Sequence, residues 1–195
     1  MPIETPEPPE EAVEAVRASI ARRARPRGLR ARAPAASVTA PQRVFTVGID
    51  ALAGEASVED SARPTGWRFL VEEAREPVAA AEVHDETGAT VPAQVTEGQF
   101  VRSTAEGLRA AEAHPSVGEA AFELRLLRAP ALNLVALWLH TAGREDLFVP
   151  LEPAPAPFEA GRAYPAGEFA ELSSALATES LEHQRAAERP DELGA

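Results

Sequence analysis

The stretch that decides the fold is FELRLLRAPALNLVALWLH, residues 122–140, where large apolar side chains are denser than anywhere else in the chain. Two strand-like runs flank residues 129–131, and a connection of this length suits an antiparallel hairpin. The second run, residues 132–140, is apolar on both faces. Such a strand needs cover on both sides, so we expect it in the centre of a sheet with Trp138 buried. A buried helix is the competing interpretation, but the run is short for one.

Apolar residues are unevenly distributed along the 195-residue chain. Of the 42 Leu, Val, Ile and Phe residues, 30 lie between positions 43 and 151. A core domain of ordinary size is therefore predicted over residues 43–151. Residues 1–42 are predicted to form a Pro- and Arg-rich flexible arm with a short helix. Residues 152–195 are predicted to form a Pro-Ala spacer, an amphipathic helix and a disordered tail.

The core is predicted to be a single α+β domain with a mostly antiparallel sheet of about six strands and one or two helices on one face. We expect the first strand over residues 43–50. Residues 78–84 suit a helix by propensity, but the turn that follows them favours a strand. A short helix is expected after Ser57. The pattern Ser103-Thr-Ala-Glu106 is a capping box, which predicts a helix over residues 104–113.

Amphipathic helices are predicted at both ends of the chain. The N-terminal one has an apolar stripe of Val13, Val16 and Ile20, which is too narrow to keep the helix folded alone. It is therefore expected either to dock, on a partner or on the core, or to fray. The C-terminal helix is expected over residues 167–185, after a stiff polyproline spacer at residues 153–157.

The arginines of the N-terminal arm are the strongest charge feature. Residues 1–42 contain seven Arg and five Glu, whereas the remainder contains 26 acidic residues and 12 Arg. Such an arm is attracted to acidic protein surfaces. It lacks aromatic residues for stacking on bases, so nucleic acid is not the expected partner. The predicted partner-binding residues, from the apolar stripe and the basic end of the helix, are Val13, Val16, Ile20, Arg22, Arg23 and Arg25.

Composition restricts the possible functions. The chain has no Cys, which excludes disulfides, thiolate metal sites and cysteine nucleophiles. Its acidic start lacks the apolar segment of a secretory signal, and no apolar run approaches the roughly 20 residues of a membrane span. All 19 basic residues are Arg, which together with the Ala and Pro content is typical of GC-rich bacterial genomes. A bacterial, cytoplasmic protein is expected.

Two groups of potential metal ligands are interpreted as surface features. His84, Asp85 and Glu86 end a predicted strand, where alternate side chains point to opposite faces and do not converge. Glu179 and His183 share a face of the C-terminal helix, as surface pairs commonly do. Neither group predicts a metal site.

His140 is the candidate with the clearest chemical setting. It ends the central strand beside a turn that contains Arg144, Glu145 and Asp146, and an acid there could orient its imidazole. A histidine that simply leaves the core at a strand end is the commoner case. No nucleophile elbow, phosphate-binding loop, dinucleotide motif or His-Glu-x-x-His pattern occurs. No catalytic, metal-binding or cofactor-binding residue is therefore predicted, and no cofactor.

The sequence favours a non-catalytic interaction or accessory protein of a bacterial cytoplasmic assembly, which docks another protein through its terminal segments. The alternative is a small-ligand-binding α+β domain, or a cone-shaped enzyme, with a pocket between sheet and helix. Convergence of His84, His140 or Arg125 on a deep cavity would favour the alternative. No pattern specifies the oligomeric state.

Overall fold

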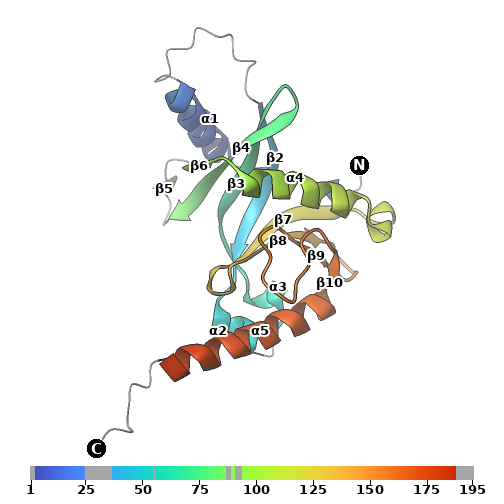
Figure 1. Ribbon diagram of the computed structural model, residues 1–195. Helices are drawn as coiled ribbons and strands as arrows, with labels where there is room; N and C mark the ends of the chain where they lie inside the picture. The colour runs from blue at the N-terminus through green and yellow to red at the C-terminus, as the bar shows by residue number, and fades with distance from the viewer. Residues whose placement is uncertain (1–2, 25–36, 55, 87–88, 91–93, 188–195) are drawn as a thin grey trace, which may run out of the picture.

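The computed structural model describes residues 3–24, 37–54, 56–86, 89–90 and 94–187 (Figure 1). Three sequence predictions lie outside this description. They concern Arg25, residues 26–36 of the flexible arm predicted over residues 1–42, and the tail after Arg189. The side chain of Arg23 lies outside the description as well.

A large, mostly antiparallel sheet forms the centre of the molecule, with the order β10-β9-β8-β7-β2-β3-β4-β5, β1 beside β7 and β6 beside β4. Among the described residues, only the β1–β7 and β2–β7 pairings are parallel. The strands are β1 (Ile3–Glu4), β2 (Ser37–Thr46), β3 (Arg63–Glu73), β4 (Glu76–Glu86), β5 (Ala89–Thr90), β6 (Gln94–Thr96), β7 (Phe122–Ala129), β8 (Leu134–His140), β9 (Leu147–Pro150) and β10 (Tyr164–Pro165). The α+β class is confirmed, whereas the predicted six strands are too few because four of the strands have only two or three residues.

The hairpin predicted from residues 122–140 is confirmed. β7 and β8 pair antiparallel, and Arg125 lies opposite Trp138. A short 3-10 turn, Pro130–Leu132, connects them, and Asn133 completes the reversal in the left-handed conformation with φ of 51°. β8 is buried on both faces, and Trp138 is 1% exposed.

Helices cover both faces of the sheet, so the prediction of helices on one face is wrong. One face carries α4 (Gln99–Glu112), whose Val101 packs with Leu70 and Ala80. The other face carries α5 (Ala166–Ala187) with the short helices α2 (Ile49–Ala53) and α3 (Val58–Ser61) at one end, and α1 (Glu10–Ala24) at the other (Figure 1). Strands that are apolar on both faces require this double cover.

The N-terminal helix packs on the chain's own sheet. Val16 is fully buried in a cluster with Trp67 and Phe69 of β3, and Val13 and Ile20 are partly buried against that cluster. Of the alternatives left open by the sequence, the structure therefore shows docking on the core.

The helix predicted from the capping box begins earlier than expected. α4 starts at Gln99, after Gly98 with φ of 110°, so Ser103 lies inside the helix. The Ser103 hydroxyl accepts a hydrogen bond from the backbone N–H of Glu152 instead of capping the helix. Gly107 permits close packing here, because a Cβ at this position would lie 2.7 Å from Leu151 Cδ2.

Two segments near the domain limits also differ from expectation. β2 begins at Ser37 rather than at residue 43. Its residues up to Thr39 and from Gln42 onward both pair with β3, and the strand continues through a register shift between these two positions. The expected polyproline spacer turns back instead of extending. Phe158 N–H donates to Pro155 O at 2.9 Å, and the Phe158 side chain is buried in the core.

Candidate functional site

Asp146 is a fully buried carboxylate at the start of β9. Its Oδ2 accepts hydrogen bonds from Trp138 Nε1 and from His140 Nδ1, the latter at 2.9 Å. Its Oδ1 accepts from the backbone N–H of Thr141 at 2.9 Å. An ionised carboxylate can only accept, so in the neutral imidazole Nδ1 carries the proton and Nε2 is the free acceptor. The His140 side chain is 31% exposed, which leaves Nε2 available to a ligand.

Local structure explains why these side chains meet. Trp138 and His140 are two residues apart on β8 and therefore share a face of the sheet. A short turn containing Gly143, with φ of 81°, returns the chain as β9, so that Leu147 pairs with Leu139. Asp146 immediately precedes that pairing and lies beside both aromatic rings.

Glu59 of α3 completes the cluster, because ligand atoms of Glu59, His140 and Asp146 all lie within 4.8 Å of one another. A hydrogen bond to Asp146, partial burial and the negative charges of Asp146 and Asp60 raise the pKa of Glu59 to about 7, although His140 opposes the shift. Burial alone would raise the pKa of Asp146. The hydrogen bonds from Glu59, His140, Thr141 and Trp138 outweigh burial and hold the pKa of Asp146 below its usual value. The raised pKa of Glu59 and the lowered pKa of Asp146 favour a proton on Glu59 over one on Asp146.

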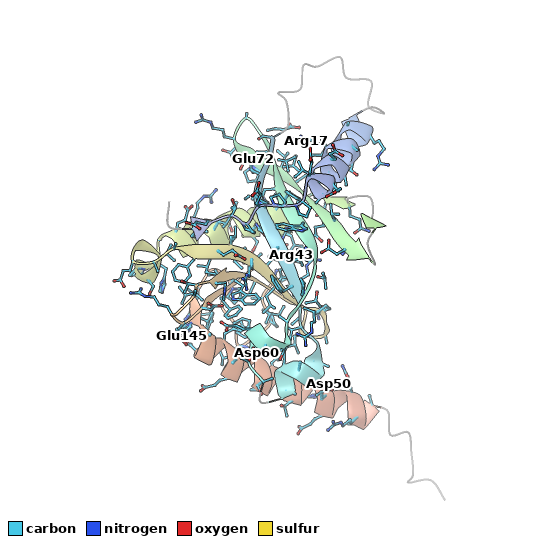
Figure 2. All side chains as sticks on the ribbon, turned by 180° about the vertical axis from the view of Figure 1, so that it is seen from behind. Arg17, Arg43, Asp50, Asp60, Glu72 and Glu145 are labelled. Atoms are coloured by element: carbon cyan, nitrogen blue, oxygen red, sulfur yellow. The ribbon has the colours of Figure 1, made fainter. Side chains whose placement is uncertain are left out.

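A cation lies on the same face of the sheet as the imidazole. Glu123 and His140 are opposite each other across β7 and β8, and Arg125 and Trp138 are opposite each other two residues further along each strand. The guanidinium of Arg125 lies 4.8 Å from the centroid of the Trp138 ring, and its Nε is 2.7 Å from Glu123 Oε1. Figure 2 labels Asp60 of α3 and Glu145 of the β8–β9 turn, which mark the two segments that converge on this site.

The arrangement suits proton transfer better than metal binding. The three side chains are close enough to chelate an ion, but both oxygens of Asp146 already accept hydrogen bonds. Only Glu59 and Nε2 of His140 would remain, whereas protein zinc sites use three or four ligands. Asp146 is therefore better described as the residue that orients His140.

The structure separates the residues of the predicted turn. It brings His140 and Asp146 together, as the sequence suggested for an acid in that turn. Arg144 instead pairs with Glu119 at 3.4 Å, and Glu145 accepts a hydrogen bond from the backbone N–H of Gly167. No sequence pattern pointed to Glu59, for which the sequence predicted only a position in a short helix after Ser57.

The other candidate ligands remain apart from this site. Asp85 forms an ion pair with Arg43 at 2.6 Å, and His84 pairs with Gly66 on the neighbouring strand. His183 Nδ1 lies 2.9 Å from the backbone carbonyl of Glu179, and both side chains are exposed on α5. The side chain of Glu86 lies outside the described residues.

Of the predicted partner-binding residues, Ile20 lines a hollow beside α1. It measures about 380 Å³ and is lined by Arg17, Ile20, Ala21, Ser37 and Val38. Arg22 is exposed, and its guanidinium donates to Ser19 Oγ at 2.9 Å.

Comparisons with known proteins leave the function to be argued from this geometry. No protein-family model, curated protein or solved structure gives a significant match to the chain. Within the described part of the chain, no helix combines the length and apolar character needed to cross a membrane.

The Glu59–Asp146 pair predicts a specific dependence of stability on pH. The raised pKa of Glu59, about 7 in the folded state against 4.5 in the unfolded state, stabilises the fold below pH 4.5. That contribution is lost as the pH rises to about 7, because the unfolded chain then releases its proton more readily. We expect the melting temperature to fall between pH 5 and 7.5 in the wild type, and to fall less in Glu59→Gln.

The matched control for this prediction is Glu106→Gln, which neutralises an exposed carboxylate on α4. It should retain the slope of the wild type. Parallel melting curves for the wild type and Glu59→Gln would mean that the two acids do not share a proton.

Proposed function

We propose that this protein is a small-ligand-binding α+β domain whose ligand lies against His140 and exchanges a proton with its imidazole. The observation that carries the proposal is the hydrogen bond between His140 Nδ1 and the buried Asp146, which leaves Nε2 without a hydrogen-bond partner among the described residues, on a side chain that is 31% exposed. A buried carboxylate that fixes the tautomer of a partly exposed imidazole is the usual preparation of a histidine for proton transfer.

The three side chains have distinct roles in this proposal. Neutral His140 accepts a proton from the ligand at Nε2. Glu59, with a pKa of about 7, holds a proton that it can donate near neutral pH. Asp146 positions the imidazole and stabilises its cationic form. Among the described residues no hydroxyl donates to His140, so the geometry supports proton transfer rather than activation of a nucleophile.

The tautomer of His140 tests the proposal without knowledge of the ligand. Long-range ¹⁵N–¹H NMR of the full chain should show His140 as the Nδ1–H tautomer when neutral. The chain has four His, and His140→Gln identifies the resonance by its loss. A neutral His140 with its proton on Nε2 would remove the acceptor that the proposal requires.

A ligand screen then tests binding. We expect ligand-observed NMR of small amines, whose protonated form can donate a proton to Nε2, to give signals that disappear in His140→Gln. His183→Gln changes an exposed histidine on α5 and should retain them. Signals that persist in His140→Gln would place the ligand elsewhere.

A second candidate is the docking of an acidic protein by the N-terminal segment, as the sequence favours. It is supported by the hollow between α1 and β2, which has the exposed Arg17 in its wall. Because Val16 is buried in the core, deletion of residues 1–42 would disturb the fold and is a poor test. Arg17→Glu should instead weaken the binding of an acidic partner, and Arg102→Glu on α4 should not.

A further inference from the structure

Two arginines lie side by side on the sheet between α1 and α3. Arg43 of β2 and Arg125 of β7 are partners in the parallel pairing of these strands. Each guanidinium also lies over a tryptophan ring: Arg43 is 5.2 Å from the centroid of Trp67, and Arg125 is 4.8 Å from that of Trp138. Figure 2 shows Arg43 in the middle of the sheet, away from Arg17 on α1 and from Asp60 on α3.

Register places these four residues in one row across the sheet. Trp138 is opposite Arg125, Arg125 is beside Arg43, and Arg43 is opposite Trp67. Cross-strand neighbours share a face of the sheet, so both arginines and both tryptophans lie on the same face. We call these residues the arginine–tryptophan row.

Like charges on adjacent strands repel, and in this row two exposed acids offset the repulsion. Asp85 pairs with Arg43 at 2.6 Å and Glu123 pairs with Arg125 at 2.7 Å. The acids are 45% and 42% exposed, whereas the two arginines are only 23% and 18% exposed. Ion pairs with such exposed partners contribute little stability, so a ligand could replace the acids at small cost.

Most donors of the two guanidinium groups remain free for a ligand. Glu123 takes only Nε of Arg125, and Asp85 takes only Nη1 of Arg43, which is also 3.4 Å from Gly66 O. Each guanidinium has five N–H donors in a planar fork that matches the oxygens of a carboxylate or phosphate. No described residue accepts from Nη1 or Nη2 of Arg125.

We propose that Arg43 and Arg125 together bind an oxyanion, the phosphate or carboxylate group of a small ligand. Stacking on the two tryptophans holds the guanidinium planes in place before the ligand arrives. The location of the rest of the ligand rests on the proposed function. Glu123 and His140 are opposite each other, two residues along the strands from Arg125 and Trp138 and on the same face of the sheet, so a group attached to an oxyanion on Arg125 can extend toward the imidazole.

Tryptophan fluorescence can test this inference because the chain has only two Trp, and each contacts one of the arginines. The full chain is titrated with inorganic phosphate and separately with acetate, at an ionic strength held constant with chloride. We expect a saturable change in fluorescence. Saturation by phosphate alone would identify phosphate esters as the ligand class. Saturation by acetate alone would identify carboxylates as the ligand class.

Substitutions establish which residues bind the anion. Arg43→Gln and Arg125→Gln should each weaken binding by about ten-fold or more, since the loss of a charge-assisted hydrogen bond costs at least about 1.4 kcal/mol, which is ten-fold in affinity. Arg102→Gln makes the same charge change on α4, across the sheet, and should leave binding unchanged. Arg125→Lys covers the case in which the Gln variants unfold, because it retains the charge but loses the planar fork and should still weaken binding.

Two outcomes would overturn the inference: no saturable change with either anion, or equal binding by the wild type, Arg43→Gln and Arg125→Lys. Either would make the arginine–tryptophan row a structural element of the sheet. His140→Gln should retain phosphate or acetate binding, because the oxyanion contacts the arginines. Failure of the proposed function, seen as the wrong tautomer of His140, is therefore distinguishable from failure of the oxyanion site.

Discussion

Replacing Trp138 with Ala should lower the free energy of unfolding by about 3–5 kcal/mol, the usual cost of truncating a buried aromatic residue. The side chain is 1% exposed and stacks on Phe148, with ring centroids 5.6 Å apart. It also contacts Phe45 in an edge-on arrangement and donates a hydrogen bond to Asp146. Urea unfolding followed by circular dichroism measures the loss.

Two matched variants separate packing from hydrogen bonding. Trp138→Phe keeps an aromatic ring but removes the hydrogen-bond donor to the buried Asp146. Loss of that hydrogen bond should lower the free energy of unfolding by about 1–3 kcal/mol, and the smaller side chain should lower it further. Trp67→Phe makes the same chemical change at a buried indole whose N–H has no acceptor among the described residues. Trp67→Phe should therefore lower the free energy of unfolding by less than Trp138→Phe does. Equal losses for the two Phe variants would show that the bond from Trp138 to Asp146 contributes little to stability.

The parts of the structure that the sequence predicted are those set by neighbouring residues. The β7–β8 hairpin follows from two apolar runs and a short connection, and the buried position of Trp138 follows from its strand. The contact between His140 and Asp146 was also foreseeable, because six residues separate them across one turn. In each case the pattern and the contact lie within one hairpin.

The start of α4 was predicted wrongly because a local pattern had a different role. Ser103 and Glu106 have the spacing of a capping box, but buried positions such as Val101 extend the apolar face of the helix by a turn upstream. The Ser103 hydroxyl instead accepts a hydrogen bond from the backbone N–H of Glu152, a residue far away in the sequence. Tertiary packing, rather than the local capping pattern, therefore determines where α4 begins.

The site residues that escaped prediction come from distant parts of the chain. Glu59 reaches Asp146 from a four-residue helix whose own sequence shows only a cap at Ser57. The proximity of Arg43 and Arg125 depends on the parallel pairing of β2 with β7. Strands β3 to β6 and α4 separate these two strands in the chain, so no alternation of residue types within either strand specifies that pairing.

Asp146→Ala should also cost about 3–5 kcal/mol, because it leaves the buried polar groups around the carboxylate without their partner. Trp138 Nε1–H, the backbone N–H of Thr141 and His140 Nδ1–H all lose their acceptor. Removal of the neighbouring charge should also lower the pKa of Glu59 toward its ordinary value. Denaturant unfolding measures the stability, and the melting temperature as a function of pH reports the change at Glu59.

Asp146→Asn distinguishes the role of Asp146 in orienting His140 from its role in packing. The amide has almost the same shape and keeps one acceptor oxygen, so this variant should be more stable than Asp146→Ala. It lacks the charge that favours a proton on Nδ1 of His140, and its NH₂ group can itself donate to the imidazole. The ¹⁵N spectrum should therefore show His140 shifted from the Nδ1–H tautomer toward the Nε2–H tautomer. A folded Asp146→Asn variant whose His140 remained entirely Nδ1–H would mean that something other than the Asp146 carboxylate prepares the imidazole for proton transfer.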